Sequence, residues 1–188
     1  MNLIIFGPPG AGKGTQADFI VNKFNLYQLS TGEVLRKEIK NKTKLGEEIS
    51  TIINSGTLVS DDIVKKLVEN FISDKQYKDR LIFDGYPRNL IQAKTLSELL
   101  SKYEQKIDLV LKLSVSLETI KKRISERRSL EKRADDSEEI AIKRYNTYEK
   151  TTEPLIDYYE KLNLLKVIDG ERSIDQINKE ISDIIALI

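Results

Sequence analysis

A glycine-rich segment near the N-terminus constrains this chain most. The segment is Gly7-Pro8-Pro9-Gly10-Ala11-Gly12-Lys13-Gly14-Thr15, between an apolar stretch at Leu3–Phe6 and a helix-like stretch at Thr15–Phe24. Glycines let main-chain N–H groups turn toward an anion, and the helix N-terminus adds its positive end. The lysine of such a loop can reach the terminal phosphates of a nucleoside triphosphate. The segment therefore predicts a phosphate-binding loop, the alternative being an ordinary βα turn that contains glycines.

The residue after the lysine departs from the usual form of such a loop. Ser or Thr commonly stands there and holds magnesium. This chain has Gly14 instead, with Thr15 one position later. We therefore expect Mg²⁺ to be held mainly by nucleotide and water.

Short apolar runs alternate with helical patterns along the chain. The runs are continuous, as is typical of buried strands in a parallel sheet, and they lie at Leu3–Phe6, Leu26–Leu29, Leu81–Phe83, Leu109–Leu113 and Leu164–Ile168. The alternation predicts an α/β fold with helices on both faces of a five-stranded parallel sheet. Ligands of such folds bind at the carboxyl ends of the strands.

Three local signals predict where helices begin or end. Ser60 is a plausible N-cap for an apolar stripe, and Ser173 with Gln176 forms a capping-box pattern before the last helix. Pro154 should end or kink the long preceding helix near Glu153.

Two stretches depart from the strand–helix rhythm. Residues 30–59 are mostly polar and helical, and residues 126–136 hold a dense cluster of charges. Both are interpreted as insertions at the ligand end, where insertions often act as lids. The core would then comprise residues 1–29, 60–125 and 137–188.

Composition narrows the function further. The chain has 188 residues with 31 Lys+Arg against 30 Asp+Glu, a balance that gives no case for a nucleic-acid or membrane partner. It has no cysteine and no histidine, which removes disulfides, Cys/His zinc sites, thiol nucleophiles and imidazole bases. No apolar run is long enough for a signal peptide or a membrane span. We expect a cytoplasmic protein.

Charged residues after the third run complete a phosphate site. Asp84 ends that run, where a carboxylate commonly holds magnesium or its waters, and Arg88 could offer a planar fork to a phosphate. Further arginines would supply the positive charge that phosphoryl transfer needs, although single arginines on a helix more often face solvent. Transfer onto another phosphate needs no general base, because that acceptor is already anionic.

Over essentially its whole length the chain resembles the adenylate kinases with a short lid. The motifs that carry the resemblance occur in the family's order: Gly7–Thr15 with Gln16, Leu29-Ser30-Thr31-Gly32 with Arg36, Gly56-Thr57-Leu58-Val59, Asp84-Gly85-Tyr86-Pro87-Arg88 with Gln92, and Arg133-Ala134-Asp135-Asp136 after the lid arginines. The resemblance implies a P-loop three-layer fold with a nucleoside-monophosphate-binding insertion at 30–59 and a short lid at 126–136.

The resemblance also implies a role for each site residue. ATP would be bound by Gly10, Ala11, Gly12, Lys13, Gly14, Thr15, Arg123, Arg127 and, through its backbone, Arg172. AMP would be bound by Thr31, Arg36, Thr57, Leu58, Val59, Gly85, Tyr86, Pro87, Arg88, Gln92, Arg133 and Arg144. The transferring phosphoryl group would be stabilised by Lys13, Arg88, Arg127, Arg133 and Arg144. Asp84 would hold Mg²⁺ through water.

Some residues depart from the family pattern or refine it. Glu33 stands where aspartate is common, Tyr86 replaces the commoner phenylalanine before a proline expected to be cis, and the lid contains no glycine. Thr31 favours AMP over UMP or CMP, because relatives acting on pyrimidines more often have alanine there. The absence of cysteine excludes the zinc-bearing long lid of some relatives.

The resemblance implies a monomeric phosphotransferase that runs MgATP + AMP ⇌ 2 ADP, with ATP, AMP and ADP as its ligands and Mg²⁺ but no zinc. One alternative is a kinase for CMP, UMP or GMP. Another is a non-catalytic nucleotide sensor, and a third is an ATP-hydrolysing switch, for which the sequence offers no water-positioning group.

Overall fold

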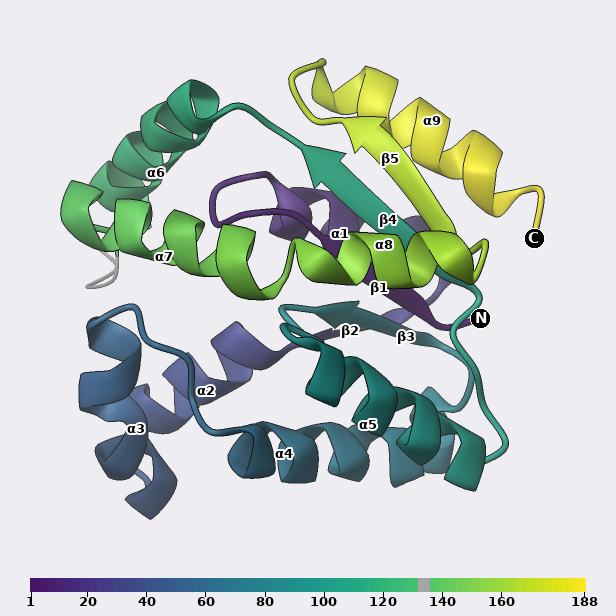
Figure 1. Ribbon diagram of the computed structural model, residues 1–188, viewed down its shortest axis with the longest axis horizontal. Helices are drawn as coiled ribbons and strands as arrows, with labels where there is room; N and C mark the ends of the chain where they lie inside the picture. The colour runs from purple at the N-terminus through teal and green to yellow at the C-terminus, as the bar shows by residue number, and fades with distance from the viewer. Residues whose placement is uncertain (132–135) are drawn as a thin grey trace.

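The computed structural model describes residues 1–131 and 136–188. Its strands are β1 (Leu3–Phe6), β2 (Tyr27–Ser30), β3 (Leu81–Asp84), β4 (Leu109–Ser114) and β5 (Leu165–Asp169). Within the described residues these strands form one five-stranded sheet in the order β2-β3-β1-β4-β5, with every neighbouring pair parallel (Figure 1). The predicted fold class is therefore confirmed.

Helices connect the strands and close the chain. They are α1 (Lys13–Phe24), α2 (Thr31–Lys40), α3 (Lys44–Asn54), α4 (Asp61–Ser73), the 3₁₀ helix η1 (Lys75–Tyr77), α5 (Leu90–Lys102), α6 (Leu117–Glu131), α7 (Glu138–Thr151), α8 (Pro154–Lys161) and α9 (Ile174–Ile185).

The three central strands β1, β3 and β4 bury side chains on both faces of the sheet. In β1, Ile4 and Phe6 belong to one core, which also takes in buried residues of α4, α5 and α8. Leu3 and Ile5 belong to the opposite core, which takes in buried residues of α1 and α9. A strand buried on both faces has no polar side to alternate with, which explains the continuous apolar runs.

Several local predictions are confirmed with small shifts. The last helix has the full capping box at Ser173 and Gln176. Pro154 is the first residue of α8, after α7 has ended at Thr151. Ser60 is at the N-cap position of α4, but its side chain makes no capping hydrogen bond.

The two predicted insertions differ in how they are built. Residues 30–59 contain α2 and α3, which pack against each other. The segment 126–136 begins inside α6, which continues to Glu131, and residues 132–135 lie outside the described part. In the described ranges, no helix combines the length and apolar character needed to cross a membrane.

Candidate functional site

One cavity of about 770 Å³ lies at the carboxyl ends of the strands. Gly7, Thr31, Gly85 and Gly170, which follow β1, β2, β3 and β5, all line it. Every site residue that the sequence predicts in the described part lines this cavity except Tyr86. Arg133, which the sequence also predicts, lies outside the described residues.

Tyr86 lies behind the cavity wall. Its side chain is 1% exposed, and its hydroxyl donates to the main-chain oxygen of Gln92 at 3.3 Å. The Tyr86–Pro87 peptide bond is cis, as predicted. Burial and the nearby Asp61 charge raise the pKa of the Tyr86 hydroxyl.

The glycine-rich loop folds around the ammonium group of Lys13. Lys13 Nζ donates to the main-chain oxygens of Gly7 at 2.8 Å and Pro8 at 3.1 Å. Gly12 has φ +94°, a left-handed conformation that costs a residue with Cβ more than it costs glycine. Burial lowers the pKa of Lys13 from 10.5 to about 8, and the charge of Asp84 partly opposes that fall.

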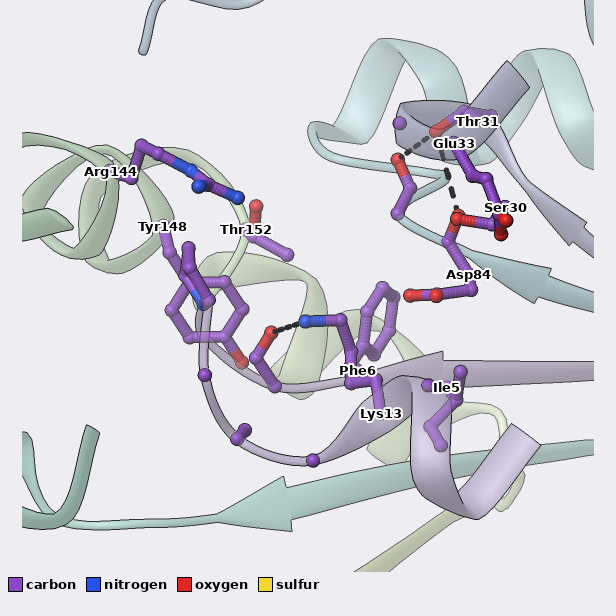
Figure 2. A pocket seen from close by; sticks show the side chains of 18 of the residues that line it. Ile5, Phe6, Lys13, Ser30, Thr31, Glu33, Asp84, Arg144, Tyr148 and Thr152 are labelled. Atoms are coloured by element: carbon purple, nitrogen blue, oxygen red, sulfur yellow. Dashed lines mark hydrogen bonds between the residues drawn. The ribbon is translucent and has the colours of Figure 1, made fainter. Parts of the chain in front are cut away.

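Asp84 points into the cavity from the end of β3. Figure 2 shows it on the same side as Ser30 and Glu33, with Arg144 on the opposite side. Gln28 Nε2 donates to Asp84 Oδ2 at 3.1 Å, which orients the carboxylate.

The carboxylate of Asp84 suits Mg²⁺, because this ion prefers one or two protein carboxylates together with waters and substrate phosphates. Among residues 1–131 and 136–188, no group of three or more His, Cys, Asp or Glu side chains could hold a metal ion by itself. A magnesium ion at Asp84 would therefore depend on the phosphates of a ligand.

Thr31 and Arg88 are both bonded to Gly85. Thr31 Oγ1 donates to the main-chain oxygen of Gly85 at 2.9 Å, and Arg88 Nε donates to the same oxygen at 2.8 Å. Gly85 has φ +75°, and a Cβ there would lie 3.1 Å from both Arg88 and Thr31. Burial, followed by the charge of Arg144, lowers the pKa of Arg88 to about 10. The guanidinium nevertheless stays charged near neutral pH.

Arg127 and Arg144 converge on one buried carboxylate. Asp136 has a fully buried side chain, which accepts from Arg127 Nε at 2.7 Å and Arg127 Nη2 at 2.5 Å. Arg144 Nη1 is 3.5 Å from the same carboxylate. Asp136 thus brings arginines of α6 and α7 together at the cavity.

Of two further arginines that line the cavity, one bonds to the phosphate loop. Arg123 donates to the main-chain oxygens of Ala11 at 3.2 Å and Gly170 at 2.9 Å. The side chain of Arg172 instead pairs with Glu180 and Asp169, which fits a contact to a ligand through its backbone.

The amide of Gln92 is held at both ends. Its Oε1 accepts from Arg88 N at 2.7 Å, and its Nε2 donates to Asp61 Oδ1 at 2.6 Å. Asn89 caps α5 by accepting from Gln92 N at 2.8 Å, and its own amide lies 3.3 Å from both Asp61 oxygens.

Sequence reasoning missed the residues that orient the site. Gln28, Asp61 and Asp136 hold Asp84, Gln92 and the two lid arginines, respectively. Asp136 belongs to the motif Arg133-Ala134-Asp135-Asp136, and this membership was the one sequence signal that could have indicated its role. No motif in the sequence assigned a role at the site to Asp61 or to Gln28.

Comparisons with known proteins agree on one family. The model of the adenylate kinase family matches residues 5–164. An adenylate kinase of Pelagibacter ubique is 44% identical over 211 aligned positions, which cover 98% of this chain and 99% of that protein. Those of Fusobacterium nucleatum and Bifidobacterium longum are each 41% identical, covering 98% and 96% of this chain and 98% and 97% of theirs.

The relatives differ in length. The alignment to the Pelagibacter protein has more positions than this chain has residues, so that protein carries residues that this chain lacks. The alignment to the Bifidobacterium protein has 181 positions over 96% of this chain, which makes it nearly free of gaps.

Proposed function

Because this chain belongs to the adenylate kinase family, we propose that its cavity binds ATP and AMP face to face and transfers a phosphoryl group between them. The enzyme is a nucleoside monophosphate kinase, and its reaction is MgATP + AMP ⇌ 2 ADP. The residue roles that follow are part of the proposal.

ATP binds over the glycine-rich loop. The main-chain N–H groups from Gly10 to Thr15 surround its phosphates at the start of α1, where the helix dipole favours anions. Lys13 exchanges its two carbonyl partners for phosphate oxygens, which offer it a full opposite charge. Arg123 and Arg127 hold the phosphates from α6, and the backbone at Arg172 contacts the base.

AMP binds between the 30–59 insertion and the end of β3. Arg36 and Arg88 hold its phosphate, and Gln92 contacts its base. Thr31, together with residues 57–59 and 85–87, forms the rest of the wall. This places the acceptor phosphate near Lys13 and Arg144, where the donor phosphate also arrives.

The transfer step depends on positive charge rather than on a base. Lys13, Arg88, Arg127, Arg133 and Arg144 stabilise the charge on the transferring phosphoryl group. The attacking AMP oxygen needs no proton removed. Mg²⁺ bound with ATP would neutralise phosphate charge, and Asp84 would hold its waters.

Closure of two segments completes the site. Residues 30–59 close over AMP and the short lid at 126–136 closes over ATP, while the remaining residues form the core. Closure excludes water, which prevents hydrolysis of ATP and strengthens the arginine contacts.

One observation carries the proposal: a single cavity brings together the phosphate loop, Asp84 and the arginines at 88, 123, 127 and 144. A sensor without catalysis has no need for this set. A kinase for another monophosphate would share it, and the alternative acceptors therefore belong in the test.

The test mixes purified protein with MgATP and AMP, CMP, UMP or GMP, and separates the products by chromatography. We expect ADP to form rapidly only with AMP, at two ADP per ATP consumed. Faster conversion of another monophosphate would overturn the acceptor assignment, and ATP binding without transfer to any of the four would favour the sensor. Monomeric state and cytoplasmic location stay predictions, to be checked by light scattering and cell fractionation.

A further inference from the structure

The side-chain amide of Gln92 has one orientation available to it. Its oxygen faces the main-chain N–H of Arg88 at 2.7 Å, and its nitrogen faces a carboxylate oxygen of Asp61 at 2.6 Å. A main-chain N–H can only donate, and an ionised carboxylate can only accept. Flipping the amide would place its oxygen against the Asp61 carboxylate and its N–H against the Arg88 main-chain N–H. The amide therefore cannot flip.

The carboxylate that faces Gln92 is itself fixed. Asp61 is the first residue of α4, and both of its oxygens lie 3.3 Å from the Asn89 side-chain amide. Asn89 is in turn held as the N-cap of α5. Asp61 is therefore an acceptor whose position is set by the starts of two helices.

The Gln92 amide keeps one N–H and one lone pair for a ligand. An amide has two N–H hydrogens and an oxygen that accepts twice, and Asp61 and Arg88 use one of each. Gln92 lines the cavity, whereas Asp61 is not among the described residues that do so. A base in the cavity therefore meets one donor and one acceptor in a fixed spatial order.

Resting on the proposed contact between Gln92 and the AMP base, we propose that Asp61 is a positioning residue that, together with the Arg88 main-chain N–H, sets specificity for adenine over 6-oxopurines. Adenine presents an acceptor at N1 and a donor at its 6-amino group. Hypoxanthine and guanine present a donor at N1 and an acceptor at O6, the reverse pattern. A glutamine amide that could flip would match either pattern, but the amide fixed by Asp61 and by the Arg88 main-chain N–H matches only one. A buried donor or acceptor that finds no hydrogen-bond partner on the ligand costs binding free energy, and this cost disfavours the wrong ligand.

The test compares AMP with IMP, whose bases differ only along this edge. In Asp61→Asn the new side-chain amide can either accept from Gln92 or donate to it, so a flipped glutamine keeps a partner at position 61 and only the Arg88 main-chain N–H still opposes the flip. We expect the ratio of kcat/KM for AMP to kcat/KM for IMP to fall about tenfold, mainly through a lower KM for IMP. Asp62→Asn is the matched control, because Asp62 is exposed, adjacent and in the same first helical turn. It should leave the ratio unchanged.

Two comparisons separate this proposal from simpler explanations. A purely structural role for Asp61 would lower kcat/KM for AMP and IMP equally, and an unchanged ratio in Asp61→Asn would overturn the proposal. Should that variant fold poorly by circular dichroism, Asp61→Ser carries the same test, since a hydroxyl both donates and accepts. Gln92→Ala tests the underlying assignment separately: unchanged kcat/KM for AMP there would remove Gln92 from the base site, whatever the Asp61 variants show.

Discussion

Lys143 Nζ donates a hydrogen bond to the main-chain oxygen of Ser55 at 2.7 Å, across 88 residues of sequence. It also lies 3.2 Å from Thr57 Oγ1. A Cβ at Gly56 would come within 2.9 Å of Ile140, so the end of the 30–59 insertion rests directly on α7. The insertion is thus held against the element that carries Arg144.

Removing this bond should weaken AMP binding more than it slows transfer. We expect Lys143→Ala to raise KM for AMP about three- to fivefold with kcat nearly unchanged, because one exposed hydrogen bond contributes about 1 kcal/mol. Initial rates at varied AMP measure the effect. Lys150→Ala, an exposed lysine two turns further along α7, is the control. A fall in kcat with constant KM would assign Lys143 to the transfer step instead.

Arg88 should be required for turnover but not for folding. Arg88→Ala removes a cation that lines the cavity. We expect kcat to fall about a hundredfold or more, by analogy with lost oxyanion donors. Arg172→Ala is the control, since that side chain is paired with Glu180 and should leave kcat within a few-fold. An unchanged turnover number in Arg88→Ala would exclude the role.

Asp136 should matter for both stability and rate. Asp136→Asn removes the buried carboxylate that Arg127 and Arg144 share, and loss of one partner of a buried ion pair should cost about 3 kcal/mol of unfolding free energy. Urea unfolding measures that loss. We also expect kcat to fall at least tenfold because both arginines lose their orientation. Full activity in a destabilised variant would show that the nucleotides alone orient them.

The lowered pKa of Lys13 predicts proton uptake when ATP binds. With a pKa of about 8, Lys13 is partly neutral at pH 8–9, and phosphate oxygens should restore its charge. We expect uptake of up to about one proton in that range, measured by titration calorimetry in buffers of different ionisation enthalpy. The Lys13→Met protein should show less uptake, and equal uptake in both proteins would place the proton elsewhere.

The lowered pKa of Lys13 also predicts how the unfolding free energy changes with pH. Because the pKa of Lys13 in the folded protein lies below the usual lysine value of 10.5, the unfolded chain binds more protons between about pH 8 and pH 10.5. The contribution of Lys13 to the unfolding free energy therefore rises with pH across this window. In Lys13→Met this contribution should be absent.

Gly46 should be essential to the insertion. A Cβ there would lie 2.2 Å from the main-chain oxygen of Glu38, where α2 and α3 cross. We expect Gly46→Ala to cost about 3 kcal/mol of unfolding free energy and to raise KM for AMP. Gly14→Ala is the control for stability, because a Cβ at Gly14 meets no atom within 4 Å. Equal stability of the two variants would mean that the helices can move apart freely.

Much of the fold could be predicted because its signals are local. The phosphate loop, the apolar runs and the capping box of α9 each lie within about ten residues of sequence. Strand limits shifted by a residue, as at β2, which ends at Ser30 because Ser30 pairs with Asp84 of β3. Strand pairing depends on a distant segment, so sequence alone could not locate that limit.

The site could be predicted only in part, because some of its contacts join residues that are distant in the sequence. Motifs gave the groups that face the cavity, such as Lys13, Arg88 and Gln92. They did not show which carboxylates orient those groups. Asp61 lies 31 residues before Gln92, and Asp136 lies nine residues after Arg127, with no spacing rule that connects either pair.

The amino-acid sequence by itself determined which chemical groups this enzyme has: a phosphate loop, a strand-ending carboxylate, a set of arginines, and no histidine or cysteine. The tertiary structure decided how those groups are held. Only folding sets Asp61 against Gln92, Asp136 against two arginines and Lys143 against Ser55. The physical reason is that helix and strand signals act over neighbouring residues, whereas hydrogen bonds and ion pairs between elements depend on how those elements pack.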